Sequence, residues 1–165
     1  MESEITSLDA EINNVDAAVD GADHQVLRYG FSIGNLNFIY DMQIPCELVK
    51  GASIYAVPNT PSWMLGLINL RGSLVPAFNL ARYFDFKEDA DTQKLLLVLG
   101  KGEKAVAFQL KTYPELLSDL TKLDEIPKLM PKVERYVLAA YSAEKIWLEL
   151  DKESFFSMLG EKVCI

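Results

Sequence analysis

The chain has 165 residues, of which 50% are hydrophobic and 24% charged, with two cysteines and a single histidine. A chain of this length suits one domain, because it buries roughly 70% of the surface that its unfolded form exposes. It contains no apolar run near the roughly 18 residues that cross a bilayer and no secretion signal, so a cytoplasmic protein without membrane insertion is expected. The single histidine argues strongly against a histidine-based triad or a His-rich metal site.

The formal charge of −8 is concentrated at the amino terminus. Residues 1–23 carry a net −7 with no Lys or Arg, so the rest of the chain carries about −1. A nearly neutral body has no basic face for phosphates, which argues against nucleic acid and anionic membrane as partners. Cys46 and Cys164 show no metal spacing or disulfide framework and are expected to be reduced thiols.

Residues 1–24 are predicted to form an acidic extension, with a boundary near Gly21. Within it, apolar residues recur at spacings of three and four, as on one stripe of a helix: Ile5, Leu8, Ile12, Val15 and Val19. Two heptads are too few for a stable coiled coil. A frayed tail therefore fits the pattern as well as a helix docked on the body or on a partner.

From Val26 onward, short apolar runs alternate with turns, which is typical of strands. Three hairpins are predicted, pairing 27–33 with 36–40, 95–99 with 105–110, and 136–141 with 146–150. The helical signals are short: a turn beginning at Thr60 and ending by Gly66, a turn within 116–120, and a last helix capped by Asp151 and ended by Gly160. The expected fold is all-β, rich in strands with small helices.

The remaining residues offer little catalytic chemistry. The turn at 100–102, Gly-Lys-Gly, is too short for a phosphate-binding glycine pattern and fits a hairpin better. The carboxylates are scattered, so a carboxylate-dependent hydrolase is only a remote alternative. We therefore expect no enzyme activity, catalytic residue, cofactor, metal or small-molecule substrate.

The most informative segment is PNTPSWMLGLINLRG at 58–72, followed by SLVPAFNL at 73–80. Pro58 and Pro61 stiffen a turn, and an apolar strand then ends at Arg71 and turns at Gly72. The five-donor guanidinium of Arg71 either closes a structural ion pair or faces a partner. On these residues alone, the ion pair is the stronger interpretation.

This segment resembles the signature of the CheW-like family, in which a proline-rich turn precedes Gly-x-x-Asn-Leu-Arg-Gly and then x-x-x-Pro-x-x-Asp-Leu. The matching positions are Pro58, Asn59, Pro61, Trp63, Gly66, Asn69, Leu70, Arg71, Gly72, Pro76 and Leu80. The resemblance extends with lower specificity over 26–159, within a CheW-like domain taken as 25–165. It implies two small five-stranded barrels side by side with a C-terminal helix.

The resemblance also implies a function: a non-enzymatic adaptor that couples a methyl-accepting chemoreceptor to a CheA-type histidine kinase. The implied interface residues are Glu47, Ile54, Asn69, Arg71 and Gly72. The alternative is a CheW-like docking or competitor module that binds another regulator through the acidic amino-terminal helix.

Three positions depart from the family pattern. Asn79 stands where the family has Asp, Lys111 stands where it has an acid, and Ala139 stands where it has Gly. With Trp147 in the final strand, these departures resemble the CheW-like proteins of pilus-linked (twitching) chemosensory systems. The departures bear on which kinase and receptor the chain serves.

Overall fold

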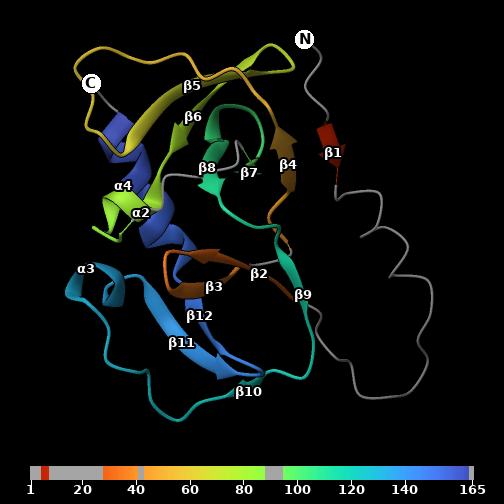
Figure 1. Ribbon diagram of the computed structural model, residues 1–165, viewed down its shortest axis with the longest axis vertical. Helices are drawn as coiled ribbons and strands as arrows, with labels where there is room; N and C mark the ends of the chain where they lie inside the picture. The colour runs from red at the N-terminus through yellow and green to blue at the C-terminus, as the bar shows by residue number, and fades with distance from the viewer. Residues whose placement is uncertain (1–4, 8–27, 41–42, 88–94, 164–165) are drawn as a thin grey trace. The chain divides into compact units, whose positions relative to one another are not determined.

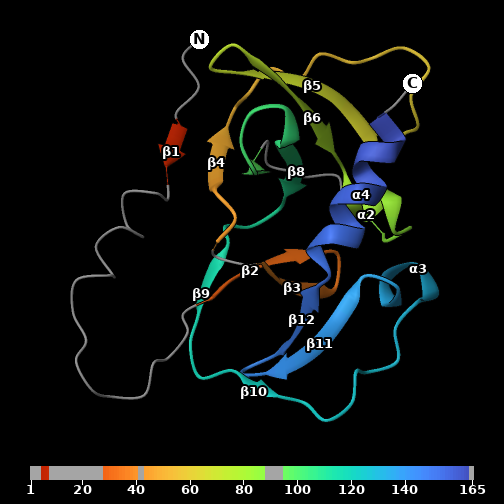
Figure 2. The ribbon, with the colours of Figure 1, turned by 180° about the vertical axis from the view of Figure 1, so that it is seen from behind.

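The computed structural model describes residues 5–7, 28–40, 43–87 and 95–163. The chain divides into two compact units that its path visits alternately (Figures 1 and 2). Unit 1 contains residues 1–24 and 43–113, and unit 2 contains residues 25–42 and 114–165. Among the helices of these described stretches, none has the length and apolar character that a membrane crossing requires.

Unit 1 is built on a six-stranded sheet in the order β1-β4-β7-β8-β6-β5. Neighbouring strands are antiparallel except for the parallel pair β6 and β8. Its elements are β1 (Ile5–Ser7), β4 (Cys46–Lys50), β5 (Met64–Leu70), β6 (Ser73–Phe78), α2 (Leu80–Tyr83), β7 (Leu95–Leu99), the short 3-10 turn η1 (Gly102–Lys104) and β8 (Val106–Leu110).

The sheet of unit 1 curls around its own core. Buried side chains from β4 through β8 meet in one cluster that includes Val49 on β4 and Ile68 on β5. These strands stand four places apart in the sheet, which would separate them by about 19 Å if the sheet were flat. Curling brings the two ends of the sheet together, as in a small barrel.

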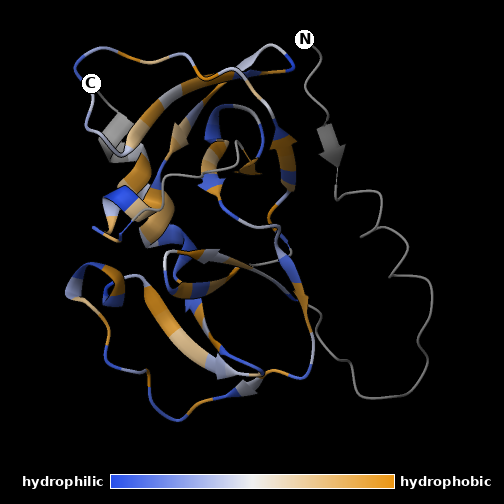
Figure 3. Cartoon of the chain, in the orientation of Figure 1, coloured by the Kyte–Doolittle hydropathy of each residue, from blue (hydrophilic) through white to orange (hydrophobic). Residues whose placement is uncertain are grey.

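Unit 2 repeats this plan with a sheet in the order β10-β11-β12-β3-β2-β9, again with one parallel pair, β12 and β3. Its elements are β2 (Arg28–Ile33), β3 (Leu36–Tyr40), β9 (Glu115–Leu117), β10 (Thr121–Lys122), α3 (Pro131–Glu134), β11 (Val137–Ser142), β12 (Ile146–Leu150) and α4 (Lys152–Val163). Its core cluster joins Ile39, Leu117 and Trp147, residues from three separate strands. Hydrophobic residues dominate β5 in unit 1 and β11 in unit 2 (Figure 3).

The strand predictions are confirmed. All three predicted hairpins are present, and they pair β2 with β3, β7 with β8, and β11 with β12. The fold is mostly β with two sheets and a few short helices. In the described residues each sheet has six strands where five are expected, and short strands lie at the edges: β1 in unit 1, and β9 and β10 in unit 2.

Two of the predicted helical turns are wrong. Residues 60–63 form a turn without a helix, because strand β5 already begins at Met64, which pairs with Phe78 of β6. Gly66, the predicted end of the helical turn, lies inside β5. In the 116–120 region, Leu116 pairs with Tyr29, so the backbone is extended.

The carboxyl-terminal helix is confirmed, but Gly160 does not end it, since α4 continues to Val163. At the amino terminus, Ile5 belongs to strand β1 instead of a helix. The other four positions of the predicted helical stripe, like Cys164, lie outside the described residues.

Candidate functional site

The segment 58–63 is a rigid turn that positions Trp63. The hydroxyl of Thr60 donates to the carbonyl of Val57 at 2.8 Å, and the amide of Met64 donates to the carbonyl of Pro61 at 3.0 Å. Trp63 stacks on Phe78, with ring centroids 6.0 Å apart. The proline-rich part of the motif therefore fixes the chain as it enters β5.

Gly66 is required by close backbone packing. Its φ is +140°, and a Cβ at this position would lie 2.2 Å from the carbonyl oxygen of Tyr55. Tyr55 and Leu67 exchange two backbone hydrogen bonds of 2.8 and 2.9 Å, which hold the 51–63 connection against β5. A side chain at Gly66 would push this connection away, so the motif glycine has a packing role.

Arg71 and Gly72 form the two-residue turn between β5 and β6. Leu70 pairs with Ser73 on either side of the turn, and both turn residues have positive φ, +51° for Arg71 and +85° for Gly72. Such turns match the twist of antiparallel strands but favour Asn, Asp or Gly. An arginine in this region costs roughly 1–2 kcal/mol. The amide of Gly72 donates to Oδ1 of Asn69 at 2.9 Å, which supports the turn.

Glu47 and Arg71 form a two-point ion pair. Nη1 of Arg71 donates to Oε2 of Glu47 at 2.9 Å, and Nη2 donates to Oε1 at 2.7 Å. The pair joins β4 to the β5–β6 turn, which come from opposite parts of the sheet order. The Arg71 side chain is 61% exposed and the Glu47 side chain 13% exposed. Glu47 thus holds a guanidinium whose remaining N–H groups face solvent.

A depression of about 250 Å³ opens beside this ion pair. The ion pair and Lys101 contribute charge to its wall, and the other lining residues are smaller or apolar: Pro45, Cys46, Leu70, Ser73, Val75, Val98, Gly100, Gly102 and Ala105. Outside the depression, the large apolar side chains of Tyr55 and Leu74 are 62% and 64% exposed. The surface around Arg71 thus combines a cation, a concavity and the exposed side chain of Leu74, which lies opposite Asn69 beside the turn.

The structure brings together four of the five residues that the sequence singles out. Glu47 and Arg71 pair, while Asn69 and Gly72 share the adjoining turn. Ile54 is partly buried against the core cluster of unit 1 and does not line the depression.

Lys101 is a lining residue that sequence reasoning misses. Its turn is correctly predicted as a hairpin, but only the pairing of β7 with β4 brings that turn to the Glu47 end of the sheet.

Asn79 explains one departure from the family pattern. It is buried, and its Oδ1 accepts from the amide of Arg82 at 3.0 Å, which caps α2. An aspartate would cap equally well, but Asn also donates from Nδ2 to Oε1 of Gln109 at 3.4 Å without burying a charge. The change therefore preserves the local structure.

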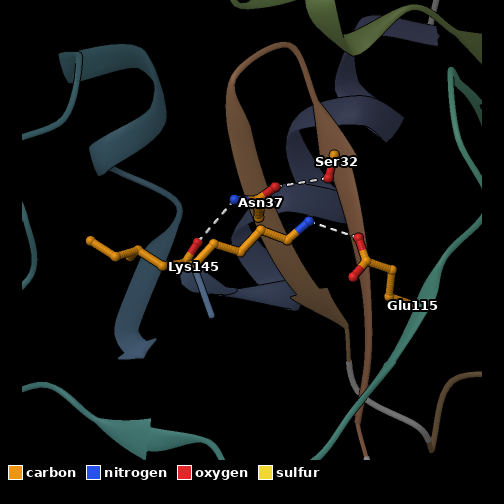
Figure 4. A network of polar contacts seen from close by, with 5 residues as sticks. Ser32, Asn37, Glu115 and Lys145 are labelled. Carbon is orange, nitrogen blue, oxygen red and sulfur yellow. Dashed lines mark hydrogen bonds and ion pairs between the residues drawn. The ribbon is translucent and has the colours of Figure 1, made fainter. Parts of the chain in front are cut away.

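A second polar cluster lies in unit 2 (Figure 4). Ser32 donates to Asn37 at 2.8 Å, Asn37 donates to the carbonyl of Ile146 at 3.1 Å, and Lys145 pairs with Glu115 at 2.7 Å. These bonds connect β2, β3, β9 and the β11–β12 turn. The carboxylate of Glu115 pairs with a cation instead of a second carboxylate. The cluster therefore serves to hold these elements of unit 2 together.

The described residues provide little support for a hydrolytic site. They contain no cluster of three or more His, Cys, Asp or Glu side chains that could hold a metal ion. The depression beside Arg71 has one carboxylate in its wall, Glu47, which pairs with a cation. A pair of close carboxylates, as glycoside hydrolysis uses, is not found at this site.

Two compact sheets, one of which carries at a turn an exposed arginine held by a carboxylate, define a β-rich module of two units. The family model for the CheW-like domain matches residues 29–159. The chain belongs to the family of CheW-like domains, as the resemblance of its 58–80 segment predicts.

Individual relatives agree with this assignment. The chain is 30% identical over 104 residues to the "Probable chemotaxis protein CheW" of Rhizobium etli, covering 62% of this chain and 65% of that protein. It is 28% identical over 109 residues to the "Chemotaxis protein CheW" of Helicobacter pylori, covering 64% of this chain and 66% of that protein. The matched stretches thus span just under two thirds of each relative.

A solved structure shares the fold. The scaffolding protein TtCheW of Thermoanaerobacter tengcongensis superposes with a TM-score of 0.62 at 18% identity, covering 77% of this chain and 89% of that one.

Proposed function

We propose that this chain is a non-enzymatic cytoplasmic adaptor that couples a methyl-accepting chemoreceptor to a CheA-type histidine kinase. The observation that carries the proposal is the CheW-like match over residues 29–159, which contains the whole site around Arg71. The relatives named as chemotaxis proteins support the same role. Identifying the partner kinase will show whether this chemosensory system controls flagellar or twitching motility.

The receptor-facing surface in this proposal consists of Glu47, Ile54, Asn69, Arg71 and Gly72. Arg71 is the polar anchor, because three of its five N–H groups are left after the two-point pair with Glu47. Glu47 orients the guanidinium, and the Asn69–Gly72 bond supports the turn that presents it. Ile54 contributes a partly buried apolar side chain, which packs against the core cluster of unit 1 from the 51–63 connection.

An adaptor of this kind acts through differences in binding free energy. It changes kinase output only if it binds active and inactive arrangements of receptor and kinase with different affinities. Each contact can be weak, because clustered receptors and kinases raise the effective concentration of every site. One exposed cation near the exposed side chain of Leu74 suits such small contacts.

Reversing the charges of the ion pair tests whether Arg71 meets a partner. In the double variant Glu47→Arg/Arg71→Glu the pair can re-form, but a carboxylate now faces outward. We expect the double variant to fold and to lose receptor-dependent kinase control in co-sedimentation with receptor membranes and the kinase. Recovery of control relative to each single variant would show that the pair acts only within the chain.

The docking or competitor module is the second candidate function. The observation that favours it is the pairing of the amino-terminal strand β1 with β4 in the unit 1 sheet. Deleting residues 1–22 separates the two candidates. An adaptor still joins receptor and kinase after the deletion, whereas a module that binds through its extension loses its partner.

A further inference from the structure

The turn between β7 and β8 brings a second cation to the depression in unit 1. The amide of Gly100 donates to the carbonyl of Pro45 at 2.8 Å, which ties the turn to the residue that precedes β4. The amide of Ala105 donates to the carbonyl of Gly102 at 3.2 Å and closes the turn. The backbone of Lys101, which lies between these two bonds, is therefore fixed at the wall of the depression.

The side chain of Lys101 is not needed to hold the fold together. Within the stretches that the structure describes, its ammonium group takes part in no hydrogen bond or ion pair. Arg71 keeps three of its five N–H groups after its two-point pair with Glu47. The wall thus carries two cations and one carboxylate that is already paired, a net charge of +1. This concavity is positive on a chain whose formal charge is −8.

The wall fits a carboxylate better than a phosphate. Attraction to a net charge of +1 grows in proportion to the charge of the ligand, whereas the cost of taking the ligand out of water grows with the square of that charge. A carboxylate has one charge and two oxygens, so it can accept from Arg71 and Lys101 at once. The depression of about 250 Å³ also has apolar wall residues, Leu70, Val75 and Val98, which can cover the methylene groups of a glutamate side chain.

We propose that the depression is a carboxylate subsite, in which Lys101 and Arg71 together bind the side chain of a glutamate on the chemoreceptor. This inference rests on the proposed function and adds Lys101 as the residue that selects a partner with an acid at this place. A free carboxylate binds weakly here, because its contacts with two solvent-accessible cations are screened. A glutamate on a docked receptor binds more effectively, because the neighbouring contacts raise its local concentration.

A small probe tests the subsite without the receptor. N-acetyl-glutamate amide, which carries a single carboxylate, is titrated into the full-length protein while the amide shifts of residues 100–102 are followed by NMR. We expect saturable shifts at millimolar probe and none with the matching glutamine derivative. Lys101→Met keeps most of the stem but removes the charge, and it should weaken binding several-fold. Lys104→Met makes the same change in the same turn, outside the lining of the depression, and should bind as wild type does.

Co-sedimentation with receptor membranes, in the absence of kinase, tests the occupant. Lys101→Met should weaken receptor binding several-fold, whereas Lys101→Arg, which keeps a cation, and Lys104→Met should bind nearly as wild type does. Direct binding to the purified kinase should be unchanged in all three variants and report that they are folded. Lys101→Glu should lose the receptor, and changing one receptor glutamate to lysine should restore binding of this variant while weakening that of wild type.

The two experiments fail separately. Equal probe binding by wild type and Lys101→Met, or equal binding of the glutamate and glutamine probes, would overturn the carboxylate subsite. Wild-type receptor binding by Lys101→Met, or the lack of any receptor glutamate whose change to lysine restores Lys101→Glu, would overturn the receptor glutamate as its occupant. If the wild-type chain binds no receptor, the proposed function fails together with that occupant, and the probe experiment still decides whether the subsite binds a carboxylate.

Discussion

Arg71 occupies a backbone conformation that costs an arginine free energy, with φ at +51°, yet it is held there by a two-point pair and a supported turn. Asn or Gly would make the same turn more easily. A residue kept in an unfavourable conformation by its surroundings is a sign of function. The structure confirms that the Arg71 guanidinium closes an ion pair; its side chain is still mostly exposed, and its contact with a partner stays a prediction.

Arg71→Asn separates the side chain's function from the turn's stability. Asn tolerates positive φ, so the relief of backbone strain offsets the lost pair, and we expect the free energy of unfolding to stay within about 1 kcal/mol of wild type. Receptor-dependent kinase control should be lost. Urea denaturation and kinase co-sedimentation measure the two effects. A variant that unfolds would mean that the pair is mainly structural.

Gly66→Ala should disrupt the entry to the site. The added methyl meets the Tyr55 carbonyl in a backbone region that already disfavours a side chain, so a loss of about 3 kcal/mol is expected. Gly51→Ala is the control: Gly51 also has positive φ, +64°, but nothing lies within 4 Å of the added atom. It should cost about 1 kcal/mol. Similar losses in denaturant titrations would argue against the Tyr55 contact.

At the scale of elements, α4 begins at a capped end. The Ser154 hydroxyl donates to Oδ2 of Asp151 at 2.7 Å and the Ser154 amide donates to Oδ1 at 3.3 Å. These bonds, the hydroxyl first, lower the pKa of Asp151 below its usual 3.8. The charged carboxylate is therefore favoured in the folded chain, as expected for a residue at a helix amino terminus.

This cap predicts a pH dependence. Because the folded pKa is lowered, the stabilisation is fully present above pH 3.8 and is lost as the pH falls through the folded pKa. Asp151→Asn keeps an acceptor but does not titrate. The melting temperature of wild type should exceed that of the variant at pH 6, and the difference should shrink toward pH 3. A difference that is independent of pH would contradict the assignment.

At the scale of the whole molecule, each unit has a core of its own, and unit 2 is assembled from two distant parts of the chain. Residues 28–40 supply β2 and β3, while everything else in the unit follows residue 114. Trp147 on β12 is buried in this core, and a Cβ at Gly30 on β2 would lie 2.2 Å from its ring. The contact joins the two parts of the unit.

Trp147→Ala should therefore weaken the whole of unit 2. Removing a buried indole leaves a cavity, and a loss of about 3–5 kcal/mol is expected in chemical denaturation. Ile146→Ala, next to it but 45% exposed, is the control and should change stability by no more than about 0.5 kcal/mol. Hydrogen exchange should show faster opening of β2 and β3 in the Trp147 variant alone.

Local features of the chain could be predicted from the sequence because they depend on neighbouring residues. The hairpins around Gly34 and Gly100 follow from apolar runs that flank turn residues, and Asp151 marks a helix start. The 58–80 segment resembles the CheW-like family closely enough to predict the family. The predictions fail where pairing overrides local preference, as at Thr60 and Leu116, which tertiary contacts place in a turn and a strand.

The sequence by itself therefore determined the strand content and the main turns, and it singled out Arg71 as a candidate site residue. Only the tertiary structure decided that Glu47 is its partner, that Lys101 lies beside it and that β1 covers β4. These contacts join residues far apart in the chain: curling of the sheet brings Arg71 to Glu47, whereas strand pairing brings Lys101 and β1 to β4. Strand order and curvature arise from long-range pairing and core packing, which no local pattern of residues specifies.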